Sequence, residues 1–94
     1  MPVAIEMNFK GATLEQYDEI LGLMGLTSGN IPPGAIFHCV AKTDDGFRVV
    51  DVWESKEVFD RFAQEQIGPF SQQVGITGPP ETIYRDVHNH LPHS

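Results

Sequence analysis

Cysteine, basic residues and long hydrophobic runs are scarce in this sequence of 94 residues, and each scarcity narrows the class of protein. Cys39 is the single cysteine, so the chain cannot form an internal disulfide, and a reducing compartment fits. No hydrophobic run approaches the roughly 20 residues of a membrane-spanning helix. The first residues also lack the basic start and the apolar stretch of a signal peptide. We therefore expect a cytoplasmic protein without a membrane partner.

Basic residues number six against thirteen acidic ones, which gives a formal net charge of −7. This balance disfavours a nucleic-acid partner, because contacts with phosphates need clustered lysine and arginine. The composition, with 40% hydrophobic and 20% charged residues, is typical of a globular chain. Residues 1–94 are predicted to form one small domain, in which 88–94 is a loose C-terminal tail.

The first predicted elements are a strand and a helix. Residues 2–9 alternate in hydrophobicity with a period of two, as a strand does. Thr13 and Gln16 match a capping box at a helix start, and Gly25 is a suitable C-terminal cap. The apolar stripe of this helix consists of Leu14, Tyr17, Ile20, Leu21 and Met24.

Two strands, a helix and a last strand are predicted to follow. Strands at 35–43 and 47–54 are joined by a hairpin at Asp44-Asp-Gly46. Ser55 is expected to cap the next helix, which Gly68-Pro69 should interrupt because proline lacks the amide donor. A short helical piece at 70–74 and a strand at 81–87 complete the prediction. The buried stripe of the second helix is Val58, Phe59, Phe62, Ala63 and Ile67.

This order of elements, β-α-β-β-α-β, predicts an α+β ferredoxin-like fold with a four-stranded antiparallel sheet. Two helices cover one face of such a sheet. The two middle strands in the sequence are nevertheless apolar on both faces, which favours a homodimer whose uncovered sheet faces meet. The alternative is an unusually apolar monomer. The side chains concerned are Ile36 and Val40 against Phe37, Cys39 and Ala41, then Val49 and Trp53 against Val50 and Val52.

His38, Asp51 and Trp53 form the sharpest candidate site. A two-residue turn at Asp45-Gly46 pairs His38 with Trp53, whereas a four-residue turn pairs His38 with Asp51. Both registers leave the three side chains on one face, because a shift of two residues preserves strand parity, whereas a three-residue bulged loop would not. An aspartate beside a histidine can make it a general base. The alternative is a structural hydrogen-bonded pair next to a packing tryptophan.

Other candidate residues have an ordinary structural interpretation beside the functional one. Tyr17 could point into a pocket between sheet and helices or fill the core. Cys39 is expected to be a buried structural thiol. Arg48 and Arg85 could bind a carboxylate, but strand arginines usually keep a sheet soluble. The histidines of the tail, His88, His90 and His93, have weak metal-ligand spacing, so no metal site is predicted.

The junction Val52-Trp53-Glu54-Ser55-Lys-Glu-Val-Phe59 resembles the strand-to-helix junction of the dimeric α/β-barrel superfamily, and within it the antibiotic-biosynthesis-monooxygenase-like domains. The resemblance covers nearly the whole chain. It implies a homodimeric barrel, and Asn8 corresponds to an asparagine on the family's first strand. In the family's haem-degrading members, the positions of a second tryptophan and of the haem-ligating histidine fall at Phe62 and Ser71 here, which disfavours haem.

The combined prediction is a small homodimeric pocket protein that acts without a cofactor as a monooxygenase on an aromatic or polyketide-like small molecule. The pocket should be bounded by the 26–34 loop and the Gly68-Pro69 break. His38 with Asp51 would be the base, while Trp53, Tyr17 and Asn8 would contact the ligand. Two alternatives stay open: a non-catalytic ligand-binding or structural dimer, and a cofactor-free isomerase or cyclase.

Overall fold

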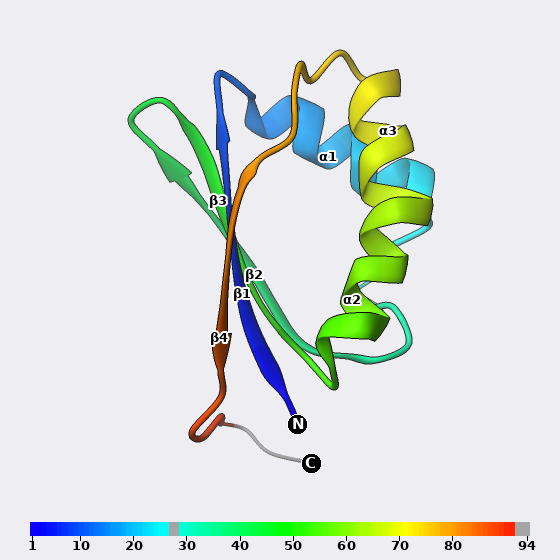
Figure 1. Cartoon of the computed structure of the whole chain (residues 1–94). Helices are drawn as coiled ribbons and strands as arrows, with labels where there is room; N and C mark the ends of the chain where they lie inside the picture. The colour runs from blue at the N-terminus through cyan, green and yellow to red at the C-terminus, as the bar shows by residue number, and fades with distance from the viewer. Residues whose placement is uncertain (27–28, 92–94) are drawn as a thin grey trace.

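The computed structural model describes residues 1–26 and 29–91 of the chain. Its elements form two layers, a twisted sheet on one side and the helices on the other (Figure 1). This arrangement confirms the predicted α+β ferredoxin-like fold with a four-stranded antiparallel sheet. The elements are β1 (Val3–Lys10), α1 (Leu14–Met24), β2 (Ala35–Thr43), β3 (Gly46–Trp53), α2 (Lys56–Phe62), the π-helical turn η1 (Ala63–Ile67), α3 (Gly68–Gln73) and β4 (Glu81–Asp86).

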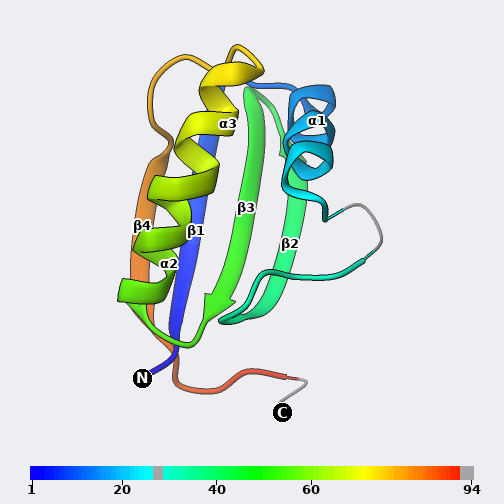
Figure 2. The ribbon, with the colours of Figure 1, turned by 90° about the vertical axis from the view of Figure 1, so that its right-hand side faces the viewer.

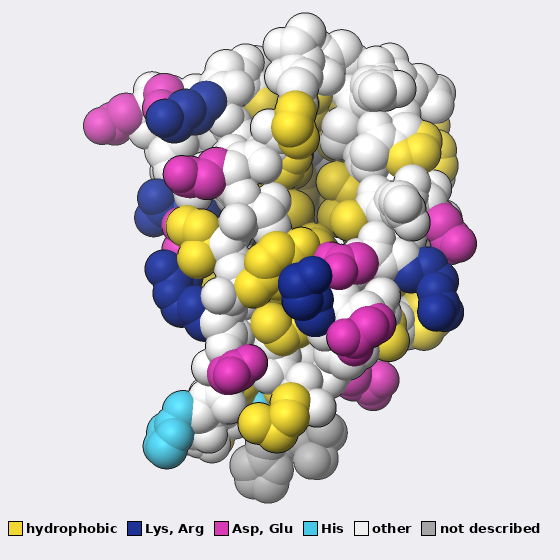
Figure 3. Space-filling model, in the orientation of Figure 1, with side chains coloured by type: hydrophobic (Ala, Val, Ile, Leu, Met, Phe, Trp, Pro, Cys, Tyr) yellow, Lys and Arg dark blue, Asp and Glu magenta, His cyan; other side chains and the backbone are white. Residues whose placement is uncertain are grey.

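The sheet order is β2-β3-β1-β4, with every neighbouring pair antiparallel. β1 lies inside the sheet and alternates strictly between buried and half-buried residues until Lys10, as its period of two predicts. Its buried side chains face the helices. They join residues from β3 and the helices in one core, whose largest fully buried members are Trp53, Phe47, Phe59 and Ile5. At the β4 edge, hydrophobic side chains are visible in a recess between sheet and helices (Figure 3).

Helix α1 begins and ends as its sequence predicts. The Gln16 amide donates to Thr13 Oγ1 at 3.1 Å, and the Thr13 amide donates to Gln16 Oε1 at 2.9 Å, which completes the capping box. Gly25 ends the helix in the left-handed conformation with φ 76°. The helix lies over the β2 side of the sheet, beside the path of α2 and α3 (Figure 2).

The predicted interruption at Gly68-Pro69 is wrong. Ser55 Oγ caps α2 by accepting from the Val58 amide at 3.2 Å, and the chain then stays helical through η1 into α3. In the π-helical turn the Gly68 amide donates to the Ala63 carbonyl, five residues back. Pro69 therefore lies in the first turn of a new α-helical segment, where a missing amide donor is tolerated.

The hairpin between β2 and β3 pairs Thr43 with Gly46 and His38 with Asp51. Of the two registers considered, this is the one that places His38 directly opposite Asp51. Gly46 is the first residue of β3 rather than a turn residue. A Cβ there would overlap the Phe9 carbonyl oxygen of β1, so close backbone approach requires the glycine.

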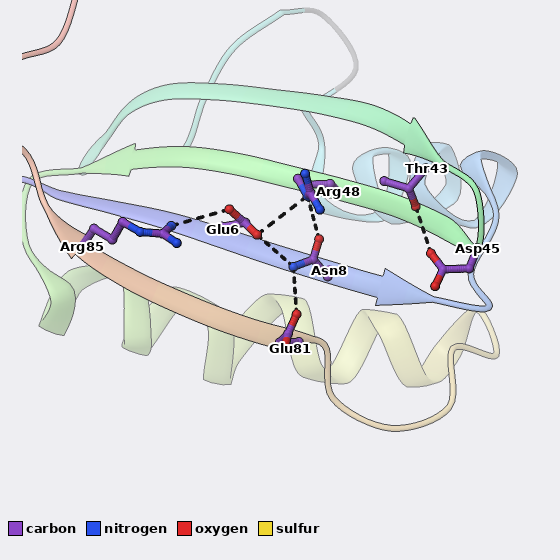
Figure 4. A network of polar contacts seen from close by, with 7 residues as sticks. All are labelled: Glu6, Asn8, Thr43, Asp45, Arg48, Glu81 and Arg85. Atoms are coloured by element: carbon purple, nitrogen blue, oxygen red, sulfur yellow. Dashed lines mark hydrogen bonds and ion pairs between the residues drawn. The ribbon is translucent and has the colours of Figure 1, made fainter.

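The sheet face turned away from the helices carries a polar network and an apolar patch. Figure 4 shows Asn8 and Glu6 at the centre of the network. Asn8 accepts from Arg48 Nε at 2.7 Å and donates to Glu81 at 3.1 Å, while Glu6 pairs with Arg48 and Arg85. These contacts occupy both arginines in salt bridges within the sheet. The network lowers the pKa of Glu6, mainly through the hydrogen bond from Asn8.

The apolar patch of this face includes Phe37, Cys39 and Val50. Phe37 is 40% exposed and Val50 is 36% exposed. Cys39 is exposed as well, so the expectation of a buried thiol is wrong. A β-bulge between Ala35 and Phe37 lies near the start of β2, but from Phe37 onward the predicted alternation holds. Both faces of β2 and β3 thus carry apolar side chains. Among the described residues, no helix has the length and apolar character to cross a membrane.

Candidate functional site

A cavity of about 550 Å³ lies between the sheet and the helices. Its lining is largely apolar and comes from β1, α1, β2, β3 and the helical path from α2 to α3. The chain segment after α1 also contributes, through Leu26 and residues 29–32. This agrees with the predicted boundary at the 26–34 loop, of which Thr27 and Ser28 lie outside the described residues. Gly68 and Pro69 do not line the cavity; their neighbours Ile67 and Ser71 do.

Four polar side chains on the cavity wall form one chain of hydrogen bonds. Asp51 on β3 accepts at one oxygen from Trp53 Nε1 at 3.0 Å, and its other oxygen lies 2.6 Å from Nδ1 of His38 on β2. His38 Nε2 in turn lies 2.5 Å from the hydroxyl of Tyr17 on α1. All four residues line the cavity. The structure therefore brings together four of the five predicted site residues.

The donors and acceptors in this hydrogen-bond chain can be assigned from the indole of Trp53 and the carboxylate of Asp51. An indole nitrogen can only donate, so Asp51 Oδ2 is an acceptor. An ionised Asp51 also accepts at Oδ1, which assigns the Nδ1 hydrogen to His38. In the neutral imidazole, Nε2 is then an acceptor and takes the hydroxyl hydrogen of Tyr17. Asp51 thus orients the ring and fixes its tautomer, as an orienting carboxylate does in catalytic triads.

Burial increases along the hydrogen-bond chain, from Tyr17 and His38 toward Trp53. The His38 side chain is 31% exposed, whereas Asp51 and Trp53 are 4% and 1% exposed as residues. Burial, followed by the charge of Asp51, raises the pKa of Tyr17 to about 12. The phenol of Tyr17 is therefore a neutral hydrogen-bond donor at ordinary pH.

Aromatic packing holds Tyr17 and Trp53, the two ends of the hydrogen-bond chain, in place. Tyr17 stacks nearly parallel to His38, at 8° and 5.9 Å between ring centroids, and meets the edge of Phe47 at 5.5 Å. Trp53 packs against Phe59 and Phe62, with centroids 5.5 and 5.0 Å away. These contacts make Trp53 a wall and a donor to Asp51 rather than an open stacking surface for a flat ligand.

Asn8 does not line the cavity. It lies on the opposite face of the sheet, because β1 directs Met7 and Phe9 toward the helices and Asn8 away from them. A change of one residue in the alignment with the family moves this side chain to the other face. Asn8 is therefore not part of the candidate site.

Two features of the cavity were missed by sequence reasoning. The bond between Tyr17 and His38 joins residues 21 positions apart on different elements, and no local pattern signals it. Ser71 on α3 is 8% exposed and lines the cavity, and within residues 1–26 and 29–91 its hydroxyl has no hydrogen-bond partner. The available signal for Ser71 was the family resemblance, which aligns it with the haem-ligating histidine of the haem-degrading members but was used only to disfavour haem.

No metal centre is evident among the described residues, where no group of three or more histidine, cysteine, aspartate or glutamate side chains could hold an ion. His93, the last histidine of the tail, lies outside them.

No family model matches the sequence, and no curated protein matches it either. Solved structures do match over nearly the whole chain. Rv0793 from Mycobacterium tuberculosis is 17% identical, with a TM-score of 0.66 over 97% of this chain and 99% of that chain. SnoaB from Streptomyces nogalater, a cofactor-independent oxygenase, is 14% identical, with a TM-score of 0.61 over 98% of this chain and 97% of its own.

A monooxygenase from the gene ActVA-Orf6 of Streptomyces coelicolor, solved with the ligand nanaomycin D, is also similar. It is 20% identical, with a TM-score of 0.53 over 99% of this chain and 92% of its own. Identities of this size show the fold alone. The chain therefore shares the fold of antibiotic-biosynthesis-monooxygenase-like proteins, as the Val52–Phe59 junction implied.

Proposed function

We propose that this protein is a cofactor-independent oxygenase that deprotonates a phenolic aromatic molecule and lets the resulting anion react with O₂. The observation that carries the proposal is the pairing of His38 with Asp51, 2.6 Å apart, on the wall of an apolar cavity. A carboxylate that orients and stabilises an imidazolium makes the histidine an effective general base.

The cavity suits a small aromatic ligand. Its volume of about 550 Å³ lies within the range of small-molecule sites. Apolar walls favour flat hydrocarbon surface, and the polar groups gather where β2, β3 and α1 meet, so a ligand hydroxyl has one preferred place. The oxygenase SnoaB and the nanaomycin D complex of the ActVA-Orf6 monooxygenase support this choice of chemistry by their shared fold.

The proposed reaction balances without a further reductant. Removal of the phenolic proton gives a phenolate, whose para carbon forms a C–O bond with O₂. The imidazolium returns its proton to the peroxide. Loss of the para hydrogen as a proton then breaks the O–O bond and releases water. One oxygen atom ends in a quinone carbonyl and the other in water, so the substrate loses the four electrons that O₂ gains.

The proposed unit is a homodimer in which the uncovered sheet faces meet. Phe37 and Val50 would be covered there, at exposures of 40% and 36% in the single chain. The cavity lies on the other side of the sheet, and each subunit would keep its own site.

Oxygen uptake and product analysis test the function. Polycyclic phenols that carry a hydrogen at the para carbon are supplied with ¹⁸O₂, and the expected product is a quinone with one labelled oxygen. His38→Ala should lower the rate by about 100-fold or more, the usual size of a general-base effect. His88→Ala, which removes an exposed histidine outside the cavity, is the matched control and should keep the full rate.

Three results would contradict the proposal in different ways. No oxygen uptake despite ligand binding would leave a ligand-binding module. Conversion of the ligand without oxygen would indicate an isomerase or cyclase. An unchanged rate in His38→Ala would remove the histidine from the chemistry. Ligand binding can be followed separately by the fluorescence of Trp53, the single tryptophan of the chain, which lines the cavity.

A further inference from the structure

We propose that Tyr17, not His38, is the group that touches the substrate, and that it relays the substrate proton to His38. This inference rests on the proposed deprotonation of a phenol, but not on the later reaction with oxygen. It assigns a catalytic role to Tyr17 of α1, for which the sequence suggested a ligand contact or packing in the core.

Both ring nitrogens of His38 are already hydrogen-bonded. Nδ1 is bonded to Asp51 and Nε2 to the Tyr17 hydroxyl, at 2.6 and 2.5 Å. A substrate hydroxyl that approaches the imidazole therefore meets Tyr17 at the only position from which Nε2 could accept a proton. Parallel stacking of Tyr17 on His38 and an edge contact with Phe47 hold the phenol in that place.

The hydroxyl oxygen of Tyr17 can form a further hydrogen bond. A phenolic hydroxyl donates once and can accept as well. Tyr17 uses its donor on His38 and retains acceptor capacity for a ligand hydroxyl. A substrate phenol can thus donate to Tyr17 Oη while Tyr17 donates to Nε2, which forms a line of donors ending at Asp51.

The proton transfer then balances at every atom. The O–H bond of the substrate breaks as a new O–H bond forms at Tyr17 Oη, and the original Tyr17 hydrogen forms an N–H bond at His38 Nε2. Tyr17 is neutral before and after the transfer. Burial raises its pKa to about 12, which disfavours a separate tyrosinate and favours the coupled movement of both protons.

A blocking role is the competing interpretation of the same contact. Tyr17 would then cover Nε2 in the free protein and swing aside when the substrate binds. The two roles give opposite results when the hydroxyl is removed. If Tyr17 is a relay, Tyr17→Phe should slow deprotonation, because no group then connects the substrate to the imidazole. If Tyr17 is a block, Tyr17→Phe should not slow deprotonation, because Nε2 of His38 is then free to accept the proton.

The experiment measures deprotonation alone, under anaerobic conditions. A hydroxylated anthraquinone serves as the probe, because its phenolate absorbs at longer wavelength than its phenol. Stopped-flow mixing with the wild-type protein should give a phenolate signal. In Tyr17→Phe its rate should fall by about 100-fold, while the Kd from Trp53 fluorescence changes less than about threefold, under 1 kcal/mol.

Tyr84→Phe is the matched control. Tyr84 donates to Asp60 at 3.0 Å and does not line the cavity, so removal of its hydroxyl should leave the phenolate rate unchanged. An equal or faster rate in Tyr17→Phe would overturn the relay in favour of the blocking role. Absence of the phenolate signal in the wild-type protein with bound probe would overturn it as well.

A second measurement needs no variant and therefore does not depend on how Tyr17→Phe folds. The rate is recorded in mixtures of H₂O and D₂O. Two protons moving together give a curved dependence on the deuterium fraction, and transfer of one proton directly to His38 gives a straight line. A curved plot is expected, and a straight one contradicts the relay. Phenolate formation without oxygen uptake would leave the relay standing and remove the oxygenase.

Discussion

Ser71 is a buried polar residue whose hydroxyl has no hydrogen-bond partner within the described parts of the chain. A buried hydroxyl without a partner costs about 1–3 kcal/mol of stability. Ser55 has the opposite setting, because its hydroxyl caps α2 by accepting from the Val58 amide. The two serines therefore allow a matched comparison at the scale of single atoms.

Ser71→Ala should raise the free energy of unfolding by about 1 kcal/mol, because it removes a polar atom that lost its water on folding. Ser55→Ala should lower the free energy of unfolding by about 1 kcal/mol, because it removes a helix cap. Urea denaturation with unchanged m-values measures both. A loss of stability in Ser71→Ala similar to that in Ser55→Ala would contradict the expectation, since it would require a partner for the Ser71 hydroxyl.

At the scale of single residues, part of the hydrogen-bonded site could be predicted from the sequence. His38, Asp51 and Trp53 share a face in either hairpin register, because strand parity depends on odd or even spacing alone. The choice between the registers could not be predicted, since it depends on backbone packing between β3 and β1 near Gly46. The contact of Tyr17 with His38 was also beyond reach, because periodicity places a side chain on a face without saying what lies opposite.

At the scale of elements, local patterns predicted the helices and strands well. The strand at 2–9 is found at Val3–Lys10, and the strand at 81–87 at Glu81–Asp86. The capping box of α1 is present in full. Pro69 is the exception, because its effect depends on the hydrogen-bond spacing of the preceding turn. A π-helical turn shifts that spacing, and no residue type in 63–67 predicts such a turn.

Gly46→Ala should destabilise the sheet strongly, because the added Cβ would overlap the Phe9 carbonyl of the neighbouring strand. Overpacking of this kind costs about 1–3 kcal/mol, and here the obstacle is backbone rather than a flexible side chain. Gly22→Ala is the control. Gly22 lies in α1 with open space around its Cβ position, so alanine should stabilise the protein by about 0.5–1 kcal/mol.

Thermal unfolding of the two glycine variants measures this contrast. A melting temperature below the wild-type value for Gly46→Ala and above it for Gly22→Ala is the expected result. A raised melting temperature in both variants would mean that the close approach of β1 and β3 does not decide the residue at position 46, and that loss of backbone freedom in the unfolded chain dominates at both sites.

At the scale of the whole molecule, the two sheet faces have different compositions that follow from strand alternation. The covered face supplies the core and the cavity. The uncovered face joins an apolar patch on β2 and β3 to the polar network around Glu6 and Asn8 (Figure 4). The sequence predicted the apolar character of this face. A pocket bounded by the 26–34 loop was also predicted, but its shape could not be, because that shape depends on the path of the chain after α1 and on how far the helices stand from the sheet.

Val50→Lys tests the proposed homodimer. Val50 lies on β3 in the apolar patch, between Cys39 of β2 and Glu6 of β1, and is 36% exposed, so a lysine there would bury a charge in the interface without disturbing the core. Leu23→Lys is the control, because Leu23 is 41% exposed on α1, away from that face. Both variants remove one surface hydrophobic residue and add one positive charge.

Light scattering coupled to size-exclusion chromatography gives the mass in solution. The wild-type protein and Leu23→Lys should have twice the chain mass of 10.4 kDa, and Val50→Lys should have the mass of a single chain. A wild-type protein of single-chain mass would contradict the homodimer directly. Equal masses for Val50→Lys and Leu23→Lys would place the interface elsewhere, because an ammonium group buried within an apolar contact must either separate the subunits or lie outside the contact.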